Sequence, residues 1–139
     1  MRRRALLLLV LTLALATPVI AEHEIFYRYT VLGYVKDPAG KPRSGQTVEL
    51  IRDKTGFSYL GHTDEAGLFV IVARLGDESV GESITLRVGG MQQRLVVRFD
   101  PVNHAEERGT RVDLEGSKAL ERPAAFRATL ANMLAAPGR

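Results

Sequence analysis

Apolar and polar positions alternate with a period of two in seven short runs between residues 25 and 116, and turn residues separate the runs. Successive side chains of a β-strand point to opposite faces, so each run predicts a strand with one buried face. The predicted strands are 25–36, 46–53, 57–63, 68–75, 83–88, 93–99 and 110–114. Seven such strands, with no helical segment between them, predict an all-β, immunoglobulin-like sandwich.

Two runs carry further information. The run 68–75 is apolar on both faces except for Arg74, which predicts the most buried strand. Gly89 and Gly90 predict a two-residue hairpin turn. If the strands alternate in direction, the turns at 54–56, 76–82 and 100–109 meet at one end of the sandwich, and we expect that end to be acidic. The acidic residues there either take part in binding or are simply solvated turn residues. The acidic residues concerned are Asp53, Asp77, Glu78, Glu82, Asp100, Glu106 and Glu107.

Two segments have strong turn chemistry. The stretch 37–45 contains Asp-Pro-Ala-Gly, in which Pro fixes φ and Gly tolerates a positive φ. The stretch 63–69 reads Thr-Asp-Glu-Ala-Gly-Leu-Phe, in which Asp can accept hydrogen bonds from turn amides and Phe anchors the core. The residues predicted to shape these structural turns are Asp37, Gly40, Pro42, Gly45, Thr63, Asp64, Gly67 and Phe69.

Together these two segments resemble the carboxypeptidase regulatory-like domains. The resemblance implies a prealbumin-like (transthyretin-like) sandwich of seven strands, and a non-catalytic accessory or binding module of a kind attached to many unrelated proteins. The serines agree with a non-catalytic module, because none of them lies in a Gly-x-Ser-x-Gly context.

Residues 1–21 have the three parts of a secretory signal peptide, predicted as a helix. Three arginines precede an apolar stretch from Ala5 to Ala16, and Val19-Ile20-Ala21 ends in the small residues of a cleavage site. The apolar stretch is too short to cross a bilayer, so we expect no stable transmembrane span after cleavage, the alternative being an uncleaved anchor. The sequence therefore predicts export from a bacterial cell, to the periplasm or outside.

The composition excludes some classes of partner and of chemistry. The formal net charge of +3 comes from Arg2, Arg3 and Arg4, so the remainder of the chain is neutral and lacks the field that attracts nucleic acid. The sequence contains no cysteine and therefore no disulfide or thiolate nucleophile.

The three histidines are His23, His62 and His104. Cleavage after Ala21 would make His23 the second residue, where the terminal amine, an amide and the imidazole together could chelate Cu(II) or Ni(II). His62 and His104 each precede a glutamate by three residues, but neither pair falls on a predicted helix, so we interpret both as surface histidines. No cofactor is expected, and metal binding by His23 is the weaker hypothesis.

Residues 117–139 form a tail in which Pro123 begins, and Pro137-Gly138 ends, a predicted amphipathic helix. Its apolar face packs on the sandwich or docks a partner, and the candidate docking residues are Phe126, Leu130, Met133 and Leu134. The sequence thus predicts an exported, non-catalytic accessory module, with residues 22–116 as its domain, that binds or scaffolds another cell-envelope protein. The alternative is a periplasmic Cu/Ni-binding accessory protein that uses His23.

Overall fold

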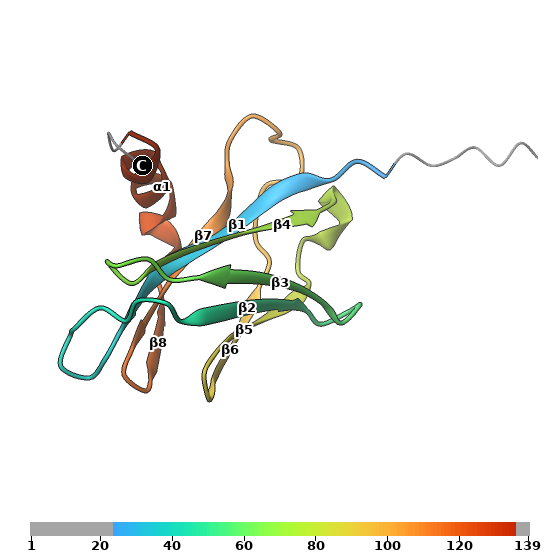
Figure 1. Ribbon diagram of the computed structural model, residues 1–139. Coiled ribbons are helices and arrows are strands. Elements are labelled where there is room, and N and C mark those ends of the chain that lie inside the picture. The colour runs from blue at the N-terminus through green and yellow to red at the C-terminus, as the bar shows by residue number, and fades with distance from the viewer. Residues whose placement is uncertain (1–23, 136–139) are drawn as a thin grey trace, which may run out of the picture.

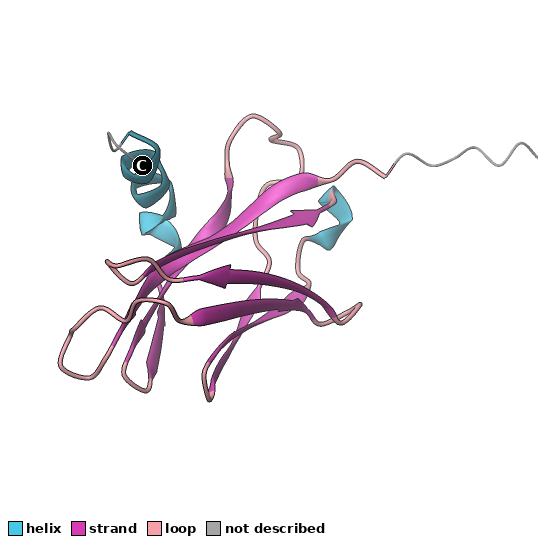
Figure 2. Cartoon of the chain, in the orientation of Figure 1, coloured by secondary structure: helices cyan, strands magenta, loops and turns pink. Residues whose placement is uncertain are grey.

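The computed structural model describes residues 24–135, where eight strands form two stacked sheets of four strands (Figure 1; Figure 2). The sheet orders are β4-β1-β7-β8 and β3-β2-β5-β6. The strands are β1 (Tyr27–Lys36), β2 (Thr47–Arg52), β3 (Phe57–His62), β4 (Leu68–Leu75), β5 (Ser83–Val88), β6 (Met91–Val96), β7 (Arg108–Glu115) and β8 (Lys118–Glu121). The prediction of an all-β sandwich is confirmed; the predicted signal peptide lies outside the described residues.

Each predicted run overlaps a strand, and β8 is an eighth strand that the sequence analysis did not predict. It pairs antiparallel with β7, so the first sheet continues into the segment assigned to the tail. A 3₁₀ turn, η2 (Pro123–Ala125), then leads into the helix α1 (Phe126–Ala135). The short C-terminal helix is therefore present, and it begins beside β7.

The pairing agrees with strands that alternate in direction. β1 is antiparallel to β4 and parallel to β7, and β5 turns into β6 through the predicted hairpin at Gly89-Gly90. β1 and β2 lie in different sheets, whereas the first two strands of an immunoglobulin constant domain share one sheet. The strand order therefore departs from that of an immunoglobulin domain.

The core lies between the sheets and is built from the inward positions of both. Its largest fully buried side chains include Tyr29, Phe69, Leu50 and Leu86. The run 68–75 is not the most buried strand, because β4 is an edge strand whose Val72 is 43% exposed on the outer face. Val31 and Leu32, in the neighbouring interior strand β1, are completely buried.

The two turn segments meet at one end of the sandwich. The Asp37 carboxylate accepts hydrogen bonds from the amides of residues 39 and 41, and Asp64 does the same for residues 66 and 68. The buried Thr63 hydroxyl donates to the carbonyl of Arg43 at 2.6 Å. Gly67, at φ +78°, accepts a hydrogen bond from the amide of Val35. The other turn residues support the contact between the two segments. Gly40 and Gly45 have positive φ, and Pro42 forms a β-bridge with Lys36. Phe69 lies in the core.

Close approach of two backbones generates a stability prediction. A Cβ added to Gly33 of β1 would lie 1.7 Å from the carbonyl oxygen of Val112 in β7. We expect Gly33→Ala to lower the free energy of unfolding by about 3 kcal/mol, because the strands must separate to admit the methyl group. Urea denaturation measures the loss. Gly90→Ala is the matched control, since its Cβ would meet nothing within 4 Å, and equal stability of the two variants would contradict the prediction.

Candidate functional site

The loop between β6 and β7, residues 97–107, is held in place from beneath by Arg108. This side chain is only 5% exposed. Its Nη2 donates hydrogen bonds to the carbonyl oxygens of Asp100, Pro101 and Asn103, at 3.3, 3.5 and 3.2 Å. Loop carbonyls have no strand partner, so a buried guanidinium with several donors is well suited to bind them. Arg108 thus holds three carbonyls of the loop, and the side chains of Asp100 and Asn103 accept hydrogen bonds from further loop amides.

Aromatic rings and a carboxylate complete the surroundings of Arg108. Its guanidinium carbon lies 4.0 Å from the ring centre of Phe99 and 4.7 Å from that of Tyr27. His104 stacks on Tyr27 with 4.5 Å between ring centres, and its Nε2 lies 2.9 Å from the Asp77 carboxylate. Burial alone would raise the pKa of Asp77, but His104 and Arg108 hold that pKa below its ordinary value. The loop is therefore joined to β1 and to the segment before β5.

A second arginine acts at the same end. Arg52 of β2 makes a two-pronged ion pair with Glu82, at 2.8 and 2.7 Å, and also donates to the buried Ser79 hydroxyl. Ser79 belongs to η1 (Asp77–Ser79), the 3₁₀ turn between β4 and β5. The turns at 54–56, 76–82 and 100–109 thus meet as predicted, but several of the acidic side chains there are paired with arginines rather than forming a bare acidic surface.

The helix α1 is attached to the outer face of the first sheet at its beginning. The ring of Phe126 is 2% exposed and lies so close to Gly109 that an added Cβ would be 2.6 Å from it. Further along, Arg111 of β7 donates to the Thr129 hydroxyl at 3.0 Å. Of the two alternatives for the apolar face of this helix, Phe126 follows the first: its ring packs on the protein's own sandwich and is not part of an exposed docking face.

A buried carboxylate lies beneath this attachment. Asp113 accepts hydrogen bonds from Arg111, from the amide of Tyr34, and from Arg122. Burial by itself would raise the pKa of Asp113, but these partners hold it below its ordinary value. β7, β1 and the segment before α1 are therefore joined through one side chain.

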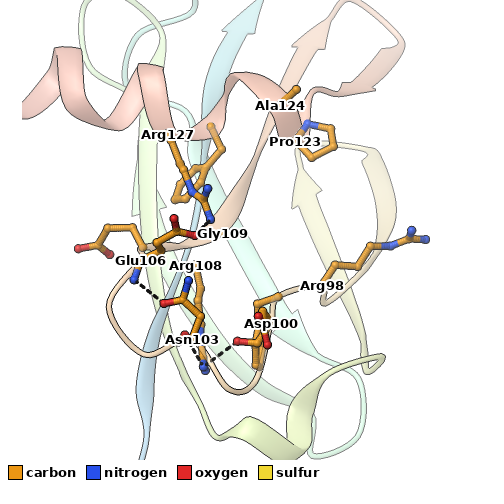
Figure 3. A pocket seen from close by; sticks show the side chains of 12 residues that line it. Arg98, Asp100, Asn103, Glu106, Arg108, Gly109, Pro123, Ala124 and Arg127 are labelled. Carbon is orange, nitrogen blue, oxygen red and sulfur yellow. Dashed lines mark hydrogen bonds and ion pairs between the residues drawn. The ribbon is translucent and has the colours of Figure 1, made fainter.

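Between the loop and α1 the surface is hollowed. A pocket of about 200 Å³ opens where the loop faces the start of α1, and its lining includes Asn103, Arg108 and Arg127 (Figure 3). Glu106 and Arg127 point toward each other there, with 2.6 Å between their charged atoms. Next to it, a groove of about 250 Å³ is lined by Glu106, Glu107, Arg127, Leu130, Ala131 and Leu134.

The two described histidines lie apart from each other, whereas the remaining docking candidates follow one another along α1. His62 ends β3 on the exposed face of the second sheet, whereas His104 is in the loop at the other end. Leu130 and Met133 are half-buried, and Leu134 is 73% exposed. His23 lies outside the described residues. Within residues 24–135 no group of three or more His, Asp or Glu side chains is arranged to hold a metal ion, and no helix there could cross a membrane.

No protein-family model and no curated protein matches the sequence. Among solved structures, the chain is similar to chlorocatechol 1,2-dioxygenase from Pseudomonas putida, at 8% identity and a TM-score of 0.50 over 68% of this chain. It spans 61% of that protein's length. It is also similar to the dioxygenase domain of a dioxygenase carbohydrate-binding protein fusion from Streptomyces sp. SirexAA-E, at 18% identity and a TM-score of 0.44, over 72% of this chain and 79% of that one. At 8% identity the first likeness shows a common fold alone.

The role of Arg108 predicts a local effect of its replacement. Arg108→Lys keeps the charge, but an ammonium cannot reproduce the guanidinium contacts with three carbonyls and two rings. We expect amide hydrogen exchange in residues 102–106 to become at least about tenfold faster, while the strands stay protected. Arg98→Lys is the control because Arg98 is exposed. Unchanged exchange in the loop would contradict this role of Arg108.

Asp113 predicts a pH effect on stability. Its pKa is lower in the folded chain than in the unfolded one, so its contribution is complete above the unfolded value of about 3.9 and is lost as the pH falls through the folded value. We expect Asp113→Asn to lower the free energy of unfolding by about 2 kcal/mol at neutral pH, with a difference from wild type that shrinks in acid. Urea denaturation between neutral pH and strong acid tests this. A difference that stays constant with pH would contradict it.

Proposed function

We propose that this chain is an exported, non-catalytic accessory module that binds or scaffolds another cell-envelope protein through the loop 97–107 and α1. The observation that carries the proposal is the buried Arg108, whose contacts give this loop a defined conformation. A binding loop that is ordered before its partner arrives loses less conformational entropy on binding. A rigid loop on a sandwich is the usual arrangement of a recognition surface.

The loop also exposes a side chain suited to contact. Val102 is 85% exposed although it is apolar, and its amide donates to the Asp100 carboxylate at 3.0 Å, which helps to fix the turn. Single exposed apolar residues are common. Here the exposed residue lies in a loop anchored from beneath, and the apolar groove along α1 adjoins the same loop. The loop and the groove are therefore the two parts of the candidate surface.

The proposal includes two further predictions from the sequence. We propose that residues 1–21 direct export, and that the sandwich is a carboxypeptidase regulatory-like domain of prealbumin-like type. The contact between the two turn segments supports the second part, because the residues that carry the resemblance bind one another through Thr63, Gly67 and Val35.

Site-specific photo-crosslinking in the organism that encodes the chain tests the proposal. With a benzophenone amino acid at Val102, we expect one discrete adduct with a protein of the envelope fraction, because the loop lies at the contact. The matched control places the same amino acid at Leu60 of β3, which is 64% exposed on the other sheet. Adducts of equal yield from both positions, or none from Val102, would refute binding through this loop.

A further inference from the structure

The groove along α1 has a wall from the helix and a wall from the loop, and most of its exposed lining is apolar. Arg127, Leu130, Ala131 and Leu134 line it from the helix, and Glu106 and Glu107 line it from the loop. Its volume of about 250 Å³ suits one or two apolar side chains of a binding partner rather than a whole element. Leu134 is the most exposed of the large apolar side chains there.

Both walls are fixed by contacts already described. Arg127 of α1 reaches Glu106 of the loop at 2.6 Å, Phe126 is buried at the helix start, and Arg108 holds the loop. The groove therefore exists before a partner binds, and little ordering entropy opposes binding.

The loop wall specifies the charge of the partner. Its carboxylates are Glu106 and Glu107, and Glu106 is already paired with Arg127 of the helix wall. Glu107 binds Arg28 at 3.1 Å, but the Arg28 side chain is 70% exposed. Exposed ion pairs of this kind contribute little to stability, so a cation of a partner can replace Arg28 at small cost.

Two other occupants fit less well. A contact between two copies through this groove is disfavoured, because the small groove provides far less area than a stable dimer buries. An anionic lipid surface would be repelled by Glu106 and Glu107 but attracted by Arg127 and Arg28, so the charges at the groove give it no net attraction.

We infer that the groove binds an apolar side chain of a partner protein next to a lysine or arginine, with the apolar group against Leu130 and Leu134 and the cation at Glu107. This inference rests on the proposed function and names the chemistry of the partner.

Two synthetic helical peptides of about 14 residues test the inference, with the same leucines but flanked by lysines in one and glutamates in the other. The exported protein, labelled with ¹⁵N, is titrated with each peptide. We expect the lysine peptide to bind at least about tenfold more tightly, to shift the amides of residues 106–107 and 130–134, and to weaken as salt rises.

Three variants identify the residues responsible for peptide binding and for the preference for lysine. Leu134→Asp should lower affinity for the lysine peptide at least about tenfold, and Glu107→Lys should remove the preference for lysine. Leu60→Asp is the control of matched exposure and should change neither affinity. All three side chains are exposed, so the fold should be retained, which circular dichroism verifies.

The outcomes separate this inference from the proposed function. Equal affinity for both peptides, binding of neither, shifts elsewhere, or a dimer that Leu134→Asp dissociates would overturn the inference, and an adduct at Val102 would still support the accessory module. If no adduct forms at Val102, the proposed function is overturned, whatever the affinities of the two peptides are.

Discussion

The connection from β4 to β5 passes from one sheet to the other, and two arginines hold it from the two sheets. Arg52, at the end of β2, binds Glu82, and Arg108, at the start of β7, lies 2.9 Å from Asp77. The connection has one 3₁₀ turn of its own, and residues 81 and 82 form backbone hydrogen bonds with Val97. The two arginine side chains add the contacts that join the connection to β2 and β7. Because Arg108 also binds the carbonyls of the loop 97–107, both loops at this end depend on one buried cation. The groove along α1 depends on it indirectly, since that loop is one of its walls.

The features that the sequence predicts well are those whose signal lies within a few consecutive residues. Asp37 and Asp64 each accept hydrogen bonds from amides two and four residues later, so their turns are visible in the local pattern. The burial of Arg108 also has a local signal in the sequence, namely the alternation of residues along β7. Positions 108, 110, 112 and 114 share one face of β7, and Val112 and Leu114 belong to the core. An arginine in that series predicts a buried cation that must find partners.

Other features could not be predicted because distant segments create them. Asp113 belongs to the outer face of β7, where a carboxylate should be solvated, and it is buried by Arg122 and the segment that leads into α1. β8 has only four residues, too few for alternation to be recognised. The exposure of β4 follows from its edge position, and hydropathy does not determine strand order.

The acidic end shows why a sum of charges describes a site poorly. Asp77 and Glu82 belong to the cluster expected from the sequence, yet each is paired with an arginine that holds a loop. Replacing such an arginine by a partner's cation would release the loop, so these carboxylates are structural. Glu107 pairs instead with the exposed Arg28, and exchange there disturbs little else. The same residue type therefore has two roles at one end of the sandwich, and the burial of its partner decides which carboxylates can take part in recognition.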